Sequence, residues 1–430
     1  MNYAEAVRFL YGLQLFGAKF GLQNTRKLAA LAGNPQEKLR FIHVAGTNGK
    51  GSTCAMLESI YRASGLRTGL FTSPHLVSFA ERIQVNRVLA TESEIAVLVE
   101  EMIPLLKKFP RATHPTFFEV VTVMALKYFR ARKCDLVIWE TGMGGRLDAT
   151  NIVTPLASVI TNVQFDHEKW LGNSLKDIAF EKAGIIKEGV PVVTATGKPE
   201  ALEVIKKIAD EKNSPLIRVT RTETKKMPLR RIKVSLPGEH QRLNAALAIA
   251  ATQVLHGQIP VTEPHLVCGL SGVRWDGRLQ LIQKNGRTFL LDGAHNPSGA
   301  QALVKTLAEI FPRKKITLIL GALADKQWES MGKILAPLAK KIMVVPVSSE
   351  RTVFPGDLNT FFQRLNGKAE IRSCRNLKEG IASTRRGEFV LISGSLYLIG
   401  EALELLQPEN IFSPDERGLN EWSAPKRSKR

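Results

Sequence analysis

A glycine-rich loop between an apolar run and a helical pattern dominates this sequence, at residues 41–53, FIHVAGTNGKGST. Apolar residues recur at helical spacing from Met56 to Tyr61, and Gly65 is a suitable helix end. The order predicts a strand, a phosphate-binding loop and a helix. Glycines allow backbone N–H groups to surround phosphate oxygens, and the helix N-terminus adds the positive end of its dipole.

Within this loop, we expect Lys50 to reach the terminal phosphates of a nucleotide and Ser52 or Thr53 to place a hydroxyl on Mg²⁺. The spacing is a variant of G-x-x-x-x-G-K-[ST], because Val44 stands at the first glycine position and Gly51 follows the lysine. The alternative, a glycine-rich turn with a solvated lysine, is disfavoured by the flanking strand and helix patterns. The loop residues expected to bind ATP are Thr47, Asn48, Gly49, Lys50, Gly51 and Ser52.

Length and composition indicate a cytoplasmic protein of two domains. The chain has 430 residues with 44% hydrophobic content, which is enough for more than one core. It contains no uncharged apolar run long enough to span a bilayer and no signal-peptide pattern, so we expect no membrane partner. The four cysteines have neither metal-ligand nor redox spacing, which favours reduced thiols.

The chain is strongly basic, with 60 Lys and Arg against 40 Asp and Glu and a net charge of +20. Such a charge attracts anions such as ATP, glutamate or an oligoglutamate tail, and nucleic acid is the obvious rival. The sequence shows no basic helix with interleaved aromatic residues and no zinc-finger spacing, so we expect no nucleic-acid partner. The densest basic cluster, PKRSKR, is predicted to be a disordered tail near 420–430.

Apolar runs that alternate with helical patterns predict an α/β fold. LRTGLFT, CDLVIWE, LASVITNV and VPVVTA read as strands of a mostly parallel, P-loop type sheet, and residues 216–236 suggest a small β element at its rim. After an interruption between Gly272 and Arg287, four more strand-like runs predict a second, smaller Rossmann-like α/β domain. We therefore expect domains at 1–283 and 284–430.

Polar residues follow four of the predicted strands. They are Lys50, Ser73, Glu140 and His167, and the carboxyl ends of parallel strands share one sheet edge. Together they would suit Mg²⁺ and a triphosphate. Glu140 follows an apolar run and would need a cation, although a strand-end salt bridge is the alternative. For His167 the alternative is a satisfied polar residue in a loop with Asp166.

Several motifs taken together resemble one family. They are GTNGKGS, TSPHL with ERI, WETGMGGRLDATN, TNVQFDH, EKAGIIK, GRLQ and LDGAHNP. The sequence is similar to the folylpolyglutamate synthase and dihydrofolate synthase family of Mur-type amide ligases, from about Gly46 to Asn296. The resemblance implies an ATP-dependent ligase that adds L-glutamate to dihydropteroate and to folates through an acyl phosphate.

The resemblance also implies two Mg²⁺ ions and a modified lysine. The matching metal ligands are Ser52, Ser73, Glu140 and His167. The lysine of EKAGI, here Lys182, is carbamylated in the family, and a desolvated lysine near cations has the lowered pKa that this chemistry needs. On sequence alone, Lys182 would rather form an ordinary ion pair with Asp177 or Glu181.

In the second domain, Asp292 and His295 follow a predicted strand, and a helix N-cap role is the alternative for either. The resemblance places the aspartate against the nucleotide and adds Asn244 and Arg278 as ATP contacts. Nucleotide binding would then draw the two domains together.

For the pterin, the resemblance implies two short segments. They are Thr116, Phe117, Phe118 and Glu119, and Leu147, Asp148 and Ala149. Aromatic faces suit a flat heterocycle, although phenylalanines are commonly core residues. GGRLDA is similar to bacterial members that perform both reactions, whereas Asp276 stands where the family commonly has proline.

Three other functions stay open at this point. The chain would be a folylpolyglutamate synthase only, another Mur-type ligase, or a P-loop switch or nucleic-acid-dependent ATPase. The TSPHL and GGRLDA signatures disfavour a cell-wall ligase, and no Asn-Lys-x-Asp motif supports a switch. We expect a monomer that acts on ATP, L-glutamate, dihydropteroate and folates.

Overall fold

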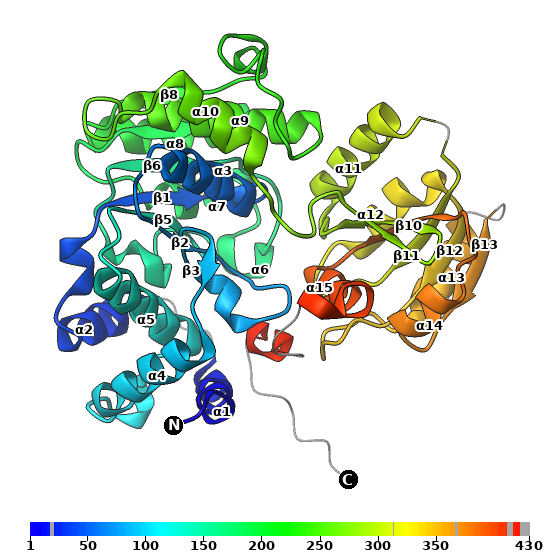
Figure 1. Ribbon diagram of the computed structural model, residues 1–430, viewed down its shortest axis with the longest axis horizontal. Coiled ribbons are helices and arrows are strands. Elements are labelled where there is room, and N and C mark those ends of the chain that lie inside the picture. The colour runs from blue at the N-terminus through cyan, green and yellow to red at the C-terminus, as the bar shows by residue number, and fades with distance from the viewer. Residues whose placement is uncertain (18–20, 313, 366–368, 411–415, 422–430) are drawn as a thin grey trace.

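Two α/β domains lie side by side in the computed structural model, which describes residues 1–17, 21–312, 314–365, 369–410 and 416–421 (Figure 1). The first domain contains a sheet of strand order β4-β3-β2-β5-β1-β6-β7-β8. Its strands are β1 (Phe41–Ala45), β2 (Thr68–Phe71), β3 (Ile83–Val85), β4 (Val88–Leu89), β5 (Leu136–Glu140), β6 (Ala157–Ile160), β7 (Val192–Thr194) and β8 (Leu216–Arg218).

The six neighbouring strands from β2 to β8 in this order are parallel, and only the β2–β3 and β3–β4 pairings are antiparallel. Every residue of β1 and β5 is buried, as expected for central parallel strands covered on both faces. The predicted mostly parallel sheet is therefore confirmed. Of the segment 216–236, only β8 is a strand, and it forms one edge of the sheet.

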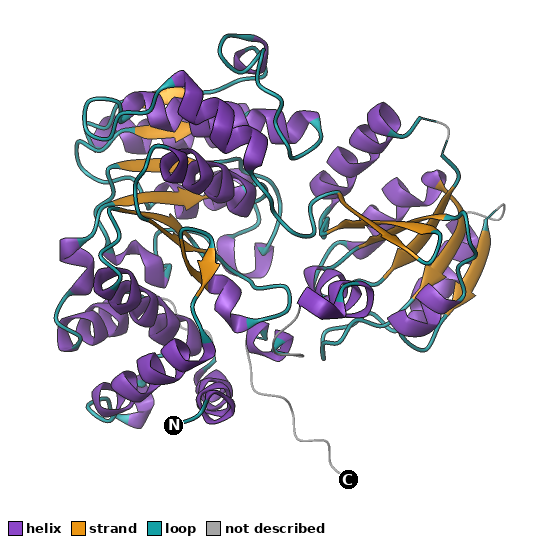
Figure 2. Cartoon of the chain, in the orientation of Figure 1, coloured by secondary structure: helices purple, strands orange, loops and turns teal. Residues whose placement is uncertain are grey.

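Helices cover both faces of this sheet (Figure 2). They are α1 (Tyr3–Leu13), α2 (Gln23–Leu31), α3 (Lys50–Ala63), α4 (Glu92–Leu106), α5 (Phe117–Ala131), α6 (Glu168–Leu171), α7 (Leu175–Ala183), α8 (Pro199–Glu211), α9 (Glu239–Val254) and α10 (Glu263–Gly272). Alternation along β1 sends Phe41 into a core with α1, α2, α4 and α5, and Ile42 into a core with α3, α9 and α10.

The second domain has a smaller sheet of order β13-β12-β11-β14-β10-β9, in which only β9 is antiparallel. Its strands are β9 (Gln280–Lys284), β10 (Arg287–Asp292), β11 (Ile316–Leu320), β12 (Ala339–Val344), β13 (Glu370–Ser373) and β14 (Phe389–Ser393). Its helices are α11 (Pro297–Ile310), α12 (Trp328–Leu335), α13 (Pro355–Leu365), α14 (Leu377–Ala382) and α15 (Leu396–Leu406).

The structure places the domain boundary earlier than expected. A division between 283 and 284 cuts β9, although all of β9 pairs with β10 in the second sheet. The glycines and charges between Gly272 and Arg287 span the end of α10, the connection 273–279, all of β9 and the turn before β10. The second domain therefore begins before Gln280.

Near its C-terminal end the chain returns to the first domain. The 3-10 helix Arg417–Asn420 lies beside α1, where Gln14 Nε2 donates to Gly418 O at 2.6 Å. Asn420 Oδ1 accepts a hydrogen bond from the buried Arg82 at 2.6 Å. Residues 422–430 of the predicted disordered tail lie outside the described residues. Within the described ranges, every helix is too short or too polar to cross a bilayer.

Candidate functional site

The phosphate loop connects β1 to α3 and requires glycine at two positions. Gly46 has φ +151°, and a Cβ added there would lie 1.8 Å from Thr161 Oγ1. Gly49 caps α3 with φ +84°, and its added Cβ would lie 2.7 Å from Asn244 Oδ1. Neither position has room for a side chain, so the backbone can approach a ligand closely.

Hydrogen bonds to the segment after β6 hold this loop in shape. The Thr47 N–H donates to Asn162 O, and the Asn48 N–H donates to Asn162 Oδ1, both at 3.0 Å. In return, Asn48 O accepts from Thr161 Oγ1 at 2.7 Å and from Asn162 Nδ2 at 3.0 Å. Lys50 Nζ donates to Gly46 O at 3.2 Å. The loop is therefore ordered before a phosphate binds.

A cavity of about 1490 Å³ opens at this edge of the first sheet and extends to the second domain. Its volume suits a nucleotide together with a second substrate. Thr53, the alternative to Ser52, is fully buried and does not line it. The other residues expected to bind nucleotide or metal do, namely Thr47, Asn48, Gly49, Lys50, Gly51, Ser52, Ser73, Glu140, His167, Lys182, Asn244, Arg278, Asp292 and His295. The structure thus brings these predicted residues together.

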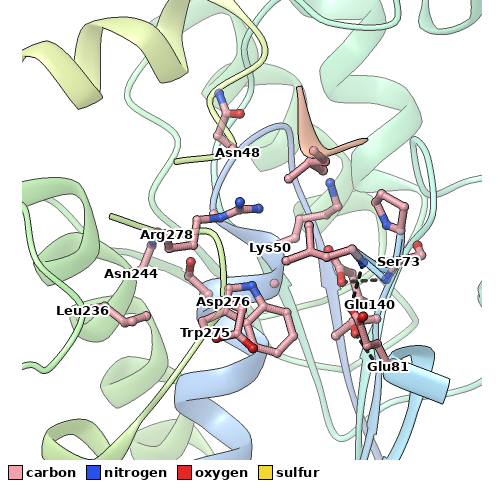
Figure 3. A pocket seen from close by; sticks show the side chains of 18 of the residues that line it. Asn48, Lys50, Ser73, Glu81, Glu140, Leu236, Asn244, Trp275, Asp276 and Arg278 are labelled. Carbon is pink, nitrogen blue, oxygen red and sulfur yellow. Dashed lines mark hydrogen bonds between the residues drawn. The ribbon is translucent and has the colours of Figure 1, made fainter. Parts of the chain in front are cut away.

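Glu140 ends β5 beside Val44 of β1, with 3% of its surface exposed. Its Oε2 accepts a hydrogen bond from the Ser73 N–H at 3.1 Å (Figure 3). Among the described residues, no cationic side chain lies within ion-pair distance of it, so the salt-bridge alternative is not found. Burial raises the pKa of Glu140 to about 7, and the nearby Lys50 charge opposes this rise.

Oxygen donors near Glu140 fit a hard cation. Ser52 lies in the first turn of α3, and its Oγ accepts a hydrogen bond from Gln241 Nε2 at 3.2 Å. Ser73 follows β2 on the neighbouring strand, and both serines line the cavity. The described residues contain no group of three or more His, Cys, Asp or Glu arranged to hold a metal ion. Two hydroxyls and one carboxylate match Mg²⁺, which commonly takes few protein ligands and completes its shell with phosphate and water.

His167 does not fit a second ion in this arrangement. It lies in the loop after β6 with φ +54°, and its Nε2 is 3.2 Å from Lys326 Nζ of the second domain. An ammonium can only donate, so the Nε2 lone pair is the acceptor. Burial and then the Lys326 charge lower the pKa of His167 to about 3. The lone pair that a metal would need is already used.

Asp166 and His167 form part of one hydrogen-bonded loop, which agrees with the alternative that His167 is a satisfied polar residue. Its Oδ1 accepts the His167 N–H at 2.9 Å and Lys326 Nζ at 2.5 Å. Burial would raise the pKa of Asp166, but the hydrogen bond from His295 and the Lys326 charge hold it well below its usual range. The carboxylate is therefore ionised and paired across the domain interface.

Lys182 is buried on α7, and its Nζ donates to Gly46 O at 3.0 Å. The expected ion pairs are absent among the described residues, because Glu181 pairs with Arg146 at 2.7 Å and Asp177 accepts hydrogen bonds from Ser174, the N-cap of α7. Burial lowers the pKa of Lys182 to about 7. A large neutral fraction of this amine near neutral pH is what reaction with CO₂ requires.

Arg278 and Asp292 bring charge from the second domain. Figure 3 shows the Arg278 side chain extending toward Lys50, so two cations approach one part of the cavity. Asp292 ends β10 and accepts the N–H groups of Leu279 and Ala294 at 3.1 and 3.0 Å. Burial raises the pKa of Asp292, which the Arg278 charge opposes.

The cap of α11 is Asn296, whose side chain accepts the Gly299 N–H at 2.8 Å. The N-cap alternative for Asp292 and His295 is therefore wrong. His295 Nδ1 bonds to Gly293 O at 2.8 Å, which leaves its other nitrogen toward the first domain.

Several lining residues were not predicted from the sequence. Gln241 forms hydrogen bonds with both Ser52 and Asn244. The Trp275 ring packs on the phosphate loop, where a Cβ added at Gly51 would lie 3.0 Å from it. The contacts of Gln241 with Ser52 and of Trp275 with Gly51 join segments far apart in the chain, so no local sequence pattern predicts them.

The seven residues expected to bind the pterin do not line this cavity. Thr116 and Glu119 form a buried capping box at the start of α5. Phe117 packs in the core, and the Phe118 ring lies 2.6 Å from where a Cβ of Gly142 would be. Since Gly142 does line the cavity, Phe118 lies directly behind its wall.

Leu147 and Asp148 lie in the loop after β5, and Ala149 begins the 3-10 helix Ala149–Ile152. The Asp148 carboxylate accepts the Met143 N–H at 2.8 Å and the Thr150 hydroxyl at 2.5 Å. It therefore braces the loop that follows Glu140, and burial raises its pKa. A pterin contact for these residues stays a prediction.

Comparisons with known proteins agree with this geometry. The Mur ligase middle domain matches residues 44–252, and the Mur ligase, glutamate ligase domain matches residues 277–396. The dihydrofolate synthase/folylpolyglutamate synthase of Bacillus subtilis is 37% identical over 428 residues, covering 94% of this chain and 99% of that protein.

Solved structures show the same architecture. The folylpolyglutamate synthase of Thermotoga maritima has a TM-score of 0.82 at 32% identity, covering 97% of this chain and 99% of that one. FolC of E. coli in complex with DHPP and ADP also has a TM-score of 0.82, at 27% identity, with 96% and 99% covered. Across nearly its whole length, the chain belongs to the Mur ligases, in the family of dihydrofolate synthases and folylpolyglutamate synthases.

Proposed function

We propose that this chain is an ATP-dependent amide ligase that adds L-glutamate to dihydropteroate, giving dihydrofolate, and to folates, giving polyglutamates. The observation that carries the proposal is the cavity that gathers the phosphate loop, Glu140 and Lys182 with Arg278 and Asp292 of the second domain. The bacterial relative of 37% identity, which is named for both activities, supports it.

The geometry suits activation of a carboxylate by ATP. A carboxylate acylates poorly, so its oxygen first attacks the γ-phosphorus, giving an acyl phosphate and ADP. Lys50, Arg278 and the loop amides would stabilise the charge of the transferring group. The glutamate amine then attacks the acyl carbon and phosphate leaves. Placement between two domains keeps water from the intermediate.

We propose that Ser52, Ser73 and Glu140 hold Mg²⁺ at the phosphate loop. A bound Mg²⁺ neutralises phosphate charge. The buried Glu140 carboxylate, which has no ion-pair partner among the described residues, supports this assignment. A second ion at His167 was expected, and Lys326 would have to leave that imidazole first.

We also propose that Lys182 is carbamylated. The neutral Nζ attacks CO₂, an N–C bond forms and one proton is released, so a buried neutral amine becomes an anion in the cavity. The lowered pKa of about 7 supports the reaction. We propose that the pterin reaches Phe118 when the cavity wall opens at Gly142. The position of the Phe118 ring directly behind Gly142 supports this.

Phosphate release tests the function. Purified protein receives ATP and Mg²⁺, with dihydropteroate and L-glutamate added separately and then together, and mass spectrometry identifies the product. We expect release only when both are present, and loss of release in Lys50→Met. Release with tetrahydrofolate but not dihydropteroate would indicate polyglutamate synthesis alone. Release that ignores both additions would refute the ligase.

The remaining expectations concern the state of the protein in the cell. We propose a monomer without nucleic-acid or membrane partners, acting in the cytoplasm. Light scattering of the purified protein measures the first of these directly, and a mass near 95 kDa, about twice the 47.5 kDa of the chain, would contradict it.

A further inference from the structure

One buried carboxylate of the first domain gathers three side chains of the second. Asp166 Oδ1 accepts Lys326 Nζ at 2.5 Å, and Oδ2 accepts Asn296 Nδ2 at 3.2 Å. His295 Nε2 lies 3.6 Å from the same Oδ2. Because all three partners follow β10 or β11, Asp166 is one point at which the second domain docks on the catalytic edge.

Lys326 is the cation of this junction. Its side chain is only 9% exposed, so its charge is largely removed from water and depends on its partners. Besides Asp166, it contacts His167 Nε2 at 3.2 Å. The next residue, Gln327, donates to Glu168 Oε1 at 2.7 Å, which fixes the same two loops together.

The contact with His167 has a chemical consequence. A metal ion binds imidazole through the nitrogen lone pair, and Lys326 already occupies the lone pair of Nε2. A divalent ion and an ammonium would also repel each other at this distance. Asp166 and His167 line the large cavity, whereas Lys326 lines a separate small cavity of about 130 Å³ on their other side.

We propose that Lys326 supplies the positive charge at His167 when the two domains are docked, and that it excludes a divalent ion from this imidazole until the domains part. Lys326 is then a positioning residue, since it acts through Asp166 and His167. The part of this inference that concerns catalysis rests on the proposed ligase function, whereas the competition for His167 does not.

Mn²⁺ binding tests the competition without turnover. Free Mn²⁺ is measured by electron paramagnetic resonance during titration of the whole protein, with no nucleotide or substrate. We expect Lys326→Met to bind Mn²⁺ at least tenfold more tightly than the unaltered protein at one site. Adding His167→Ala to that variant should remove the gain, and Lys326→Arg should behave like the unaltered protein.

The matched control is Lys333→Met, which removes an exposed lysine from the same domain and should leave the titration unchanged. If Lys326→Met does not fold, Lys326→Gln replaces it, because a neutral amide puts no charge opposite an ion. Identical titrations for the unaltered protein and the folded neutral variant would overturn the inference. A gain that persists without His167 would overturn it as well.

The same proteins are assayed for phosphate release with dihydropteroate and L-glutamate. Unaltered protein that fails to release phosphate refutes the ligase function and leaves the Mn²⁺ result readable. Active protein whose Mn²⁺ titration ignores position 326 refutes the inference and leaves the ligase standing. The two failures are therefore distinguishable.

Discussion

Replacing Lys182 with methionine should stabilise the folded protein near neutral pH while removing its activity. The side chain is 3% exposed, and burial lowers the pKa of its amine from 10.5 to about 7. In the unfolded chain the amine keeps its ordinary pKa and holds a proton. Below pH 10.5 the folded protein must therefore give up a proton or bury a charge, and both reduce the free energy of unfolding.

The size of the effect follows from the two pKa values. Each pKa unit corresponds to about 1.4 kcal/mol, so the full cost, reached below the folded pKa of Lys182, is about 5 kcal/mol. It is about 4 kcal/mol at pH 7 and about 2 kcal/mol at pH 9, and it disappears near the unfolded pKa. Methionine loses the hydrogen bond to Gly46 O, worth about 1 kcal/mol. The net gain is about 3 kcal/mol at pH 7 and about 1 kcal/mol at pH 9.

Urea unfolding followed by tryptophan fluorescence measures this difference at pH 7, 8 and 9, in buffer freed of CO₂ so that the amine stays unmodified. Lys176→Met is the matched control, since it removes an exposed lysine from the same helix. Its stability should follow that of the unaltered protein at each pH. Parallel curves for Lys182→Met and the unaltered protein would refute the reasoning, because they would show that this amine binds its proton equally in both states.

Three further changes test other parts of the structure. Gly46→Ala puts a Cβ 1.8 Å from Thr161 Oγ1, which strains the loop by on the order of 3 kcal/mol. ATP should therefore bind roughly a hundredfold more weakly in a fluorescent-nucleotide titration. Unchanged binding would contradict the loop geometry. Glu140→Gln should lower kcat roughly 10²- to 10³-fold. It should also raise the Tm at pH 8 without Mg²⁺, because burial raises the pKa of Glu140 to about 7 and the folded protein disfavours the ionised form that the unfolded chain has above pH 4.5. A lower Tm would count against this. Glu421→Gln breaks the 2.9 Å ion pair with Arg351, which holds the 3-10 helix Arg417–Asn420 against α1. Backbone amides of α1 should therefore exchange hydrogen faster. Equal exchange rates would show that this ion pair does not hold the 3-10 helix in place.

The catalytic edge of the first domain could be predicted because its signals are local. Each strand is a short apolar run, and the residue after it is fixed by chain continuity to the same sheet edge. Short-range patterns alone thus predict that Lys50, Ser73 and Glu140 lie together, and they line one cavity in the structure. The resemblance to a family added Arg278 and Asp292, which lie far from the loop in the sequence.

The docking of the domains could not be predicted in this way. Lys326 follows the unremarkable run GALAD, and nothing near it in sequence indicates Asp166 as its partner. The same holds for Arg82, which bonds to Asn420 more than three hundred residues later. Such pairs depend on how two finished domains pack, and a pattern of short-range periodicity carries no information about that.

The 3-10 helix Arg417–Asn420 links the two domains, because Asn420 bonds to Arg82 and His75 of the first and Arg417 pairs with Glu404 of the second. Together with the residues before Gln280, it connects the second domain to the first at two places besides the Asp166 contact. If the Asp166 contact opens, the second domain can rotate about the axis through these two connections, but it cannot translate along the first domain. Substrates would thus enter through a rotation about one axis. Removing the 3-10 helix Arg417–Asn420 would leave the second domain free to move about several axes.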